Sequence, residues 1–77
     1  MQVFVKNISG TTYTIDFDEN TTVEDLKIQY EKISGTPINH QDFICGGKYL
    51  SDNDVKLVDC GVSDKTTVHF ALKLHGG

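Results

Sequence analysis

The sequence predicts an α+β fold in which one helix packs across a mixed sheet, with the elements in the order β-β-α-β-β-β. Three observations predict this class. Apolar and polar residues alternate over two runs near the start, the period becomes helical in the middle, and short alternating runs return afterwards. Because a helix between strands commonly returns the chain beside an earlier strand in parallel, we expect the first and last strands to be central neighbours.

The first two runs predict a β-hairpin. Residues 2–7 alternate, with Val3 and Val5 on one side, and residues 12–17 alternate again after a connection that contains Gly10. Alternation with a period of two is typical of a half-buried strand, and two such runs around a short glycine-containing connection are typical of a hairpin. The second run places three apolar residues on one face: Tyr13, Ile15 and Phe17.

The middle of the chain predicts the helix. Thr22 can cap its start, where Glu24 and Asp25 place negative charge at the positive end of the helix. Gly35 ends it, since glycine readily adopts the left-handed conformation found just past a helix, and Pro37 keeps the chain from re-entering one. The spacing predicts one apolar helical stripe, made of Val23, Leu26, Tyr30 and Ile33.

The second half predicts three more strands. Residues 41–45 and 48–50 are separated by the turn pair Gly46-Gly47, and residues 67–72 form the last strand. Residues 51–65 form a polar excursion anchored by Leu57 and Val62. With no internal repeat or linker, we expect one domain over residues 1–72, followed by a flexible C-terminal tail over residues 73–77.

Composition excludes several classes of function. The 77 residues make one domain, and a hydrophobic share of 38% suffices for one compact core. Seven lysines, no arginine and eleven acidic residues give a net charge of −4, which lacks the basic face that nucleic acid requires. No apolar run approaches the length of a membrane span, and no signal-peptide pattern opens the sequence. We therefore expect a cytoplasmic protein, or the mature part of a protein trimmed earlier, with no nucleic-acid or membrane partner. The nucleus is a second candidate compartment.

The two cysteines, Cys45 and Cys60, are too few for a disulfide framework and are not spaced as a metal pair. We interpret them as reduced, partly buried thiols that pack as small apolar residues. A disulfide between them stays open at this point, and it would imply an oxidising compartment.

The residues at many positions resemble those of the ubiquitin family along the whole chain, with one extra residue between positions 53 and 56. No single motif is decisive, but the ordered set is specific. Besides residues 1–6, it comprises Gly10, Thr12, Thr14, Thr22, Glu24, Lys27, Gly35, Pro37, Gln41, Ile44, Gly47, Lys48, Leu50, Asp52, Asp59, Thr67, His69, Leu72, Leu74, Gly76 and Gly77. The resemblance implies the ubiquitin-like β-grasp fold and attachment to other proteins through the C-terminal glycine.

In that family an activating enzyme adenylates the terminal carboxylate, which passes to enzyme cysteines as a thioester and then to a target lysine as an isopeptide. The resemblance therefore assigns conjugation to Gly77 and Gly76, and recognition of the tail to Leu72, Lys73, Leu74 and His75. Glycines suit a narrow channel because they have no Cβ. The implied partners are activating and conjugating enzymes, ligases, deconjugating proteases, ubiquitin-binding domains and the lysines of target proteins.

The resemblance also implies a docking patch made of Ile8, Ile44, His69 and Ala71, and a lesser surface made of Gln2, Phe4 and Thr14. Successive side chains of a strand point to opposite faces of the sheet. Since Phe43 and Phe70 would face the core, we expect Ile44 and Ala71 to face outward. Exposed apolar patches with polar rims usually mark binding sites, although scattered surface apolar residues are also common.

Lys48, Lys6 and Lys27 match family lysines that accept a further modifier, although a lysine on a solvated face is often only that. Three residues depart from the family pattern: Asp42 replaces a basic residue, and Lys73 and His75 replace arginines. Lysine does not substitute fully for arginine where the planar guanidinium group pairs with a carboxylate. We expect a monomer with no catalytic residues, no metal and no cofactor of its own, because no nucleophile, base and orienting group come together in the pattern.

Three functions compete. The leading hypothesis is a covalent modifier. The second is a non-covalent interaction module or a ubiquitin mimic, which binds the same receptors without being conjugated. The third is a β-grasp sulfur carrier, since such proteins also end in Gly-Gly. The matches at Ile44 and Lys48 favour the modifier over the sulfur carrier.

Overall fold

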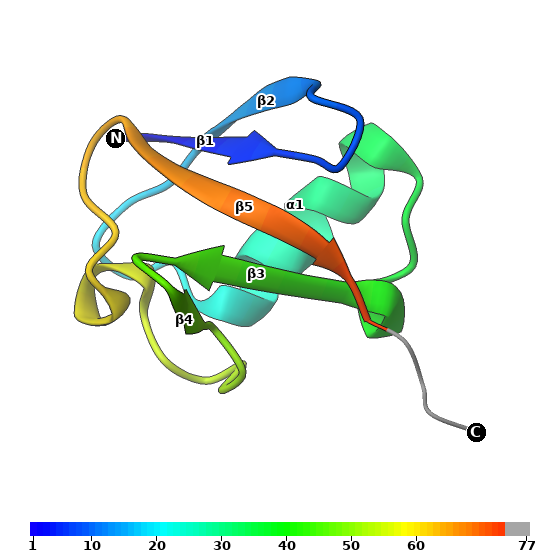
Figure 1. Cartoon of the computed structure of the whole chain (residues 1–77). Coiled ribbons are helices and arrows are strands. Elements are labelled where there is room, and N and C mark those ends of the chain that lie inside the picture. The colour runs from blue at the N-terminus through cyan, green and yellow to red at the C-terminus, as the bar shows by residue number, and fades with distance from the viewer. Residues whose placement is uncertain (74–77) are drawn as a thin grey trace.

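The computed structural model describes residues 1–73, and it is a five-stranded mixed sheet crossed on one face by a single helix (Figure 1). The predicted α+β class and the order β-β-α-β-β-β are confirmed. The strands are β1 (Gln2–Lys6), β2 (Thr12–Asp16), β3 (Gln41–Cys45), β4 (Lys48–Tyr49) and β5 (Thr66–Leu72). The helix is α1 (Val23–Ser34), and two short 3₁₀ helices, η1 (Ile38–His40) and η2 (Leu57–Cys60), lie in the connections.

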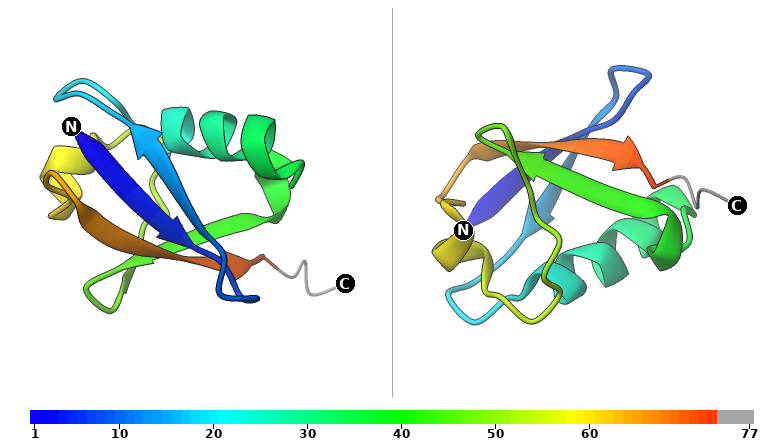
Figure 2. Two further views of the ribbon diagram at one scale, coloured as in Figure 1. Left: turned by 90° about the horizontal axis from the view of Figure 1, so that it is seen from above. Right: turned by 60° about the horizontal axis from the view of Figure 1, so that its bottom comes forward.

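The strands lie in the order β2-β1-β5-β3-β4, so the first and last strands are central neighbours as predicted. They run parallel, with Val5 opposite Val68, while β1 and β2 pair antiparallel. β5 also pairs antiparallel with β3, with Phe70 opposite Phe43. Figure 2 shows the helix on one side of this sheet and the long connections at its ends. The other side of the sheet carries no helix among the described residues.

The helix starts and ends where the sequence predicts. At its start, Thr22 Oγ1 accepts a hydrogen bond from the Asp25 backbone N–H at 3.2 Å, and Asp25 Oδ2 accepts one from the Thr22 N–H at 3.0 Å. Each residue thus satisfies a backbone donor of the other. At its end, Gly35 adopts φ 78° and donates to the Glu31 carbonyl at 2.8 Å. The left-handed φ there explains the glycine.

One member of the predicted helical stripe is misplaced. Val23, Leu26 and Tyr30 are buried, but Ile33 remains 48% exposed. Lys27 is buried instead, with 5% of its surface exposed. The apolar period alone therefore does not fix which residues of α1 are buried.

The core lies between α1 and the inner face of the sheet. The Tyr30 ring is its centre: the ring centroids of Tyr13 and Phe43 lie 5.5 Å away in edge-to-face geometry, and that of Phe70 lies 5.0 Å away, stacked. Such aromatic pairs add stability beyond the area they bury. Val3, Val5 and Val68 are fully buried from the sheet side. Since the inner face holds the core, the alternate residues of each strand form a separate outer face.

The polar excursion after β4 is anchored as predicted, because Leu57 and Val62 are buried. It is also bonded to the start of α1: the Val23 N–H donates to the Val55 carbonyl and the Leu57 N–H to the Thr21 carbonyl, both at 2.9 Å. Both cysteines are free thiols, Cys45 buried and Cys60 partly buried. None of the described helices is long and apolar enough to cross a membrane.

Candidate functional site

The outer face of the sheet brings three of the four predicted patch residues together. Ile44 on β3 lies directly opposite His69 on β5, and Ala71, two residues further along β5, lies opposite Asp42. Ile44 and Ala71 are half-buried and His69 is exposed. The strand register therefore places Ile44 and Ala71 on the outer face, as predicted.

The fourth predicted residue, Ile8, lies in the loop between β1 and β2 and is 75% exposed. Asn7 holds that loop: its N–H donates to the Thr11 carbonyl at 2.9 Å, and its Oδ1 accepts from the Thr11 N–H at 2.9 Å. Gly10 completes the turn with φ 91°. No described contact joins Ile8 to the three strand residues, so Ile8 extends the patch only through the position of its loop.

The sequence analysis missed Tyr49, which is 61% exposed and lies opposite Ile44 on β4. The signal was present in the turn. Gly46 and Gly47 both adopt positive φ, 58° and 82°, as a two-residue hairpin turn requires. Such a turn fixes the register of the strands it joins and so places residue 49 across from residue 44. We define the outer patch as Ile44, Tyr49, His69 and Ala71.

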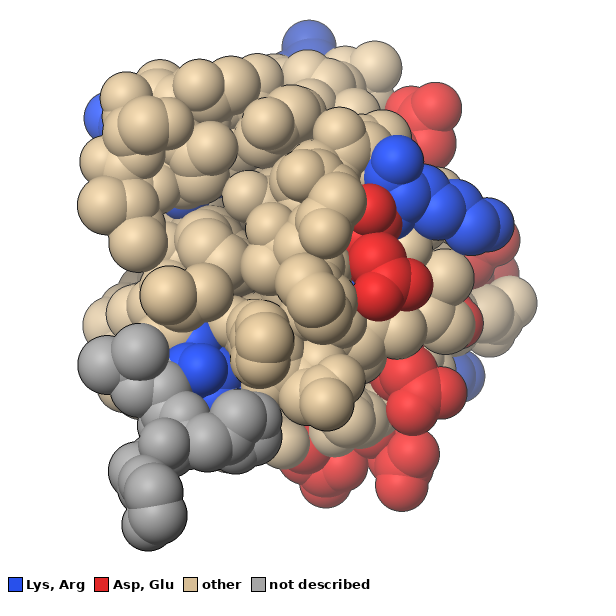
Figure 3. Space-filling model, turned by 90° about the vertical axis from the view of Figure 1, so that its right-hand side faces the viewer, with Lys and Arg blue, Asp and Glu red and all other residues tan. Residues whose placement is uncertain are grey.

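The surroundings of this face are unevenly charged. Figure 3 views the molecule from the side at which β5 ends, and it shows a broad uncharged surface with carboxylates gathered at its right and lower margins. Lys6 lies opposite His69 and so places one cation at the edge of the outer patch, while Asp42 places a half-buried carboxylate beside Ala71. The lesser predicted surface also lies on this face, with Phe4 opposite Thr14.

The tail begins at the end of β5. Leu72 is 49% exposed and pairs with Gln41, and the Lys73 N–H donates to the His40 carbonyl at 2.7 Å. The chain is therefore bonded to its own body as far as Lys73. The other predicted tail and conjugation residues, Leu74, His75, Gly76 and Gly77, lie outside the described residues.

Two of the three predicted acceptor lysines, Lys6 and Lys48, are exposed on strands. Lys27 differs, because its Nζ donates to Asn53 Oδ1 at 2.8 Å from a nearly buried position. Burial lowers the pKa of Lys27, and repulsion from Lys73 lowers it further. An acceptor role for Lys27 stays a prediction, and it requires the amine to leave Asn53.

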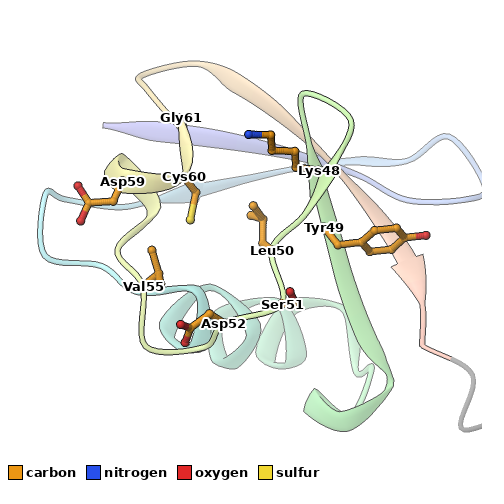
Figure 4. Close-up of a pocket in the computed structure, with 9 residues that line it drawn as sticks. All are labelled: Lys48, Tyr49, Leu50, Ser51, Asp52, Val55, Asp59, Cys60 and Gly61. Carbon is orange, nitrogen blue, oxygen red and sulfur yellow. The ribbon is translucent and has the colours of Figure 1, made fainter.

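A hollow of about 430 Å³ lies between β4 and η2, next to Lys48 (Figure 4). The Cys60 thiol points into it, opposite Leu50. Burial raises the pKa of the Cys60 thiol, and the neighbouring Asp59 carboxylate raises it further. The thiol therefore stays protonated near neutral pH, where it is a weak nucleophile. Among residues 1–73, no group of three His, Cys, Asp or Glu side chains is placed to hold a metal ion.

The sequence of this chain matches that of known proteins along nearly its whole length. The sequence profile of the ubiquitin family matches residues 3–75. The chain is 29% identical over 77 residues to the NEDD8-like protein RUB1 of Saccharomyces cerevisiae (strain ATCC 204508 / S288c), covering 100% of this chain and 99% of that protein.

Other relatives are much longer proteins. The ubiquitin-like domain-containing protein CIP73 of Lotus japonicus is 30% identical over 73 residues, covering 95% of this chain and 10% of that protein. Phosphatidylinositol 4-kinase gamma 2 of Arabidopsis thaliana is 25% identical over 69 residues, covering 90% of this chain and 12% of the kinase. The chain thus spans about a tenth of the length of these two relatives.

Proposed function

This chain belongs to the ubiquitin family, and we propose that it is a protein modifier joined through its Gly77 carboxylate to lysines of target proteins. The carboxylate would be adenylated, passed to an enzyme thiol as a thioester and transferred to a lysine as an isopeptide, the thioester dividing one difficult acyl transfer into easier steps. The chain contributes the acyl group and the docking surface. The partner enzymes contribute the nucleophile, so the chain itself is proposed to be non-catalytic and to need no cofactor.

One observation carries this proposal: the uncovered outer patch includes two residues, His69 and Ala71, of the strand that leads into the tail. Ala71, the last residue of the outer patch on β5, is followed by Leu72 and then by Lys73 at the end of the sheet. An enzyme that docks on Ile44 and His69 can therefore reach the beginning of the tail without crossing the molecule. The end-to-end match to the NEDD8-like protein RUB1 supports the same function.

We propose partners of several kinds: activating and conjugating enzymes, ligases, deconjugating proteases and ubiquitin-binding domains. Tyr49 and Asp42 give this face an exposed phenol and a carboxylate, so enzymes that dock here need groups complementary to both. The chain would act as a monomer in the cytoplasm and nucleus. Lys48 and Lys6 are the better candidates for accepting a further copy, because their amines are exposed.

The test is ATP-dependent transfer. The tagged chain is incubated with ATP and an extract of its source cells, and target peptides are sequenced after trypsin digestion. Because trypsin cuts after Lys73, a conjugated lysine would carry the remnant Leu74-His75-Gly76-Gly77, which differs in mass from the remnant of ubiquitin itself. A chain that lacks Gly76 and Gly77 is the control. If no lysine carries this remnant, or the shortened chain yields the same adducts, conjugation is refuted.

The second candidate is a non-covalent module, which the matches to short regions of CIP73 and the phosphatidylinositol 4-kinase favour. It predicts binding to ubiquitin receptors that survives removal of Gly76 and Gly77 and is lost in Ile44→Ala. A sulfur carrier would instead show the mass increase of a C-terminal thiocarboxylate in the chain recovered from cells. Intact-mass measurement separates these outcomes from the isopeptide.

A further inference from the structure

The hollow between β4 and η2 has an apolar floor. The side chains of Leu50, Val55 and Cys60 converge on it from the end of β4, from the following loop and from η2 (Figure 4). Leu50 is buried, and Val55 and Cys60 are half-buried. The floor is uncharged near neutral pH, because burial holds the pKa of the Cys60 thiol above its ordinary value. A volume of about 430 Å³ lies in the range of pockets that take up a ligand group.

The margin of the hollow is acidic. Asp52 and Asp59 line it, and both are exposed. The Asp54 N–H donates to Asp52 Oδ1 at 3.0 Å, which holds that side chain in place and leaves its other oxygen without a hydrogen bond among residues 1–73. The Asp59 carboxylate makes no hydrogen bond or ion pair in that part of the chain, and the amine of Lys48, which also lines the hollow, pairs with neither carboxylate there. The negative charge at the margin is therefore not neutralised by the described residues.

This charge is felt inside the hollow. Besides burial, the carboxylates of Asp59 and Asp52 both raise the pKa of the Cys60 thiol. A group that lies against the floor would therefore meet the same negative potential as the thiol does. A cationic group is attracted to such a place and an anionic group is repelled from it.

An apolar floor with an acidic margin fits an arginine side chain. The methylene stem of arginine covers apolar surface while its charged head stays at the edge in contact with water, as long cationic side chains commonly do. The planar guanidinium presents five donors in a geometry that matches carboxylates, whereas the lysine ammonium is a compact and strongly hydrated charge. A purely apolar occupant would cover the floor but leave the carboxylates of Asp52 and Asp59 without a partner.

Tyr49 connects this hollow to the outer patch. It lines the hollow, and it also lies opposite Ile44 on the outer patch. Figure 4 shows its ring directed away from the floor, so the ring does not fill the hollow. A protein that docks on the outer patch therefore needs to extend only past Tyr49 to place a side chain in the hollow.

We propose that the hollow is an arginine pocket, which receives one arginine side chain of a protein docked on the outer patch. The stem lies against Leu50, Val55 and Cys60, and the guanidinium pairs with the carboxylates at the margin. Arginine is enriched among the residues that dominate binding at interfaces, so this pocket selects partners that carry an arginine at the matching place. The pocket rests on the part of the proposed function that makes the outer patch a docking surface, and it does not depend on conjugation through Gly77.

The test is an NMR titration of the full chain with the methylamide of acetylarginine. The expected result is a saturable shift of the signals of Leu50, Val55 and Cys60. The citrulline analogue keeps the length and shape of arginine without its charge, and it should bind about fivefold more weakly, the upper end of what a partly exposed ion pair contributes. The lysine analogue should also bind more weakly than arginine.

Three outcomes of this titration would overturn the proposal. Equal binding of the citrulline analogue would mean that the carboxylates at the margin do not pair with the occupant. Equal binding of the lysine analogue would mean that any cation suffices and would remove the assignment to arginine. Shifts spread over the acidic surface without saturation at the hollow would mean attraction by net charge alone.

The double variant with Asp52→Asn and Asp59→Asn tests the margin. An asparagine at position 52 can still accept the hydrogen bond from the Asp54 N–H, so the turn should be kept. In this variant the arginine compound should bind no more tightly than the citrulline analogue. Asp16→Asn is the matched control, because it removes a carboxylate from β2 at the opposite edge of the sheet, and it should keep the preference for arginine. Loss of the preference in both variants contradicts the pocket.

Cys60→Phe tests the floor, because a larger side chain fills the hollow. It should abolish the saturable shifts at Leu50 and Val55, whereas Cys60→Ser keeps the hollow open and should bind as the unaltered chain does. Binding that survives Cys60→Phe refutes the location, and the aspartate variants serve if Cys60→Phe fails to fold. Ile44→Ala should bind the arginine compound normally. Failure of docking at the outer patch, or of conjugation, is therefore distinguishable from failure of the pocket.

Discussion

The nearly buried Lys27 ammonium allows a quantitative test of how the helix is joined to the loop after β4. Its Nζ is bonded to the neutral Oδ1 of Asn53 at 2.8 Å, and burial lowers its pKa. Asn53→Ala removes this acceptor and leaves a charge with its bonding incomplete. Since hydrogen bonds to charged groups contribute roughly 1.5–3 kcal/mol, the free energy of unfolding should fall by about 2 kcal/mol. For a domain of this size the melting temperature should fall by about 10 °C.

Lys27→Met is the matched control, because it removes the charge and keeps the length of the side chain. Replacing a buried charge by an apolar residue of similar volume is often neutral or stabilising, so the change in unfolding free energy should stay within about 1 kcal/mol. In the double variant, Asn53→Ala should cost much less than it does alone. Urea denaturation of the unaltered chain, the two single variants and the double variant gives the coupling energy between Lys27 and Asn53. If Asn53→Ala costs the same with methionine at position 27, the bond does not stabilise the fold.

The pH dependence of the same pair has a definite sign. The pKa of Lys27 is lowered on folding, so at alkaline pH below the ordinary lysine pKa the unfolded chain binds more protons than the folded chain. The stability contributed by this group is therefore complete above the ordinary pKa and is lost as pH falls through the folded value. Burial raises the pKa of Tyr30, whose contribution is lost as pH rises. Only the difference between the unaltered chain and Lys27→Met isolates the lysine, and that difference should shift in favour of the unaltered chain as pH rises.

Three further predictions concern single side chains. In limited acetylation followed by mass spectrometry, Lys48 should react well before Lys27, and equal rates would contradict the burial of Lys27. Thr22→Ala should lower the free energy of unfolding by about 1 kcal/mol, as measured by urea denaturation, because it removes the acceptor that caps α1, whereas Thr22→Ser should restore most of it. The raised pKa of Cys60 predicts slow alkylation at neutral pH that accelerates as pH rises, and fast alkylation at neutral pH would contradict it.

The sequence could predict the fold because its local signals agree with one another. The alternation around Val3 and Val5, the cap at Thr22, and the glycine at position 35 each specify their element within a few residues. The parallel pairing of β1 and β5 could be predicted from the rule for a crossover connection alone. The burial of Lys27 could not, because it depends on the loop after β4, where Asn53 accepts a hydrogen bond from the Lys27 amine. The exposure of Ile33 could not be read from the apolar period either.

The candidate site was predictable to the extent that strand parity fixes it. Ile44, His69 and Ala71 meet on the outer face because their parity and the register agree. Tyr49 lies opposite Ile44 because the two-residue turn Gly46-Gly47 fixes the register of β3 and β4, so its place on this face was predictable from the turn that the sequence predicts. The residues that carry the chemistry, Gly76 and Gly77, were assigned by resemblance and lie outside the described residues.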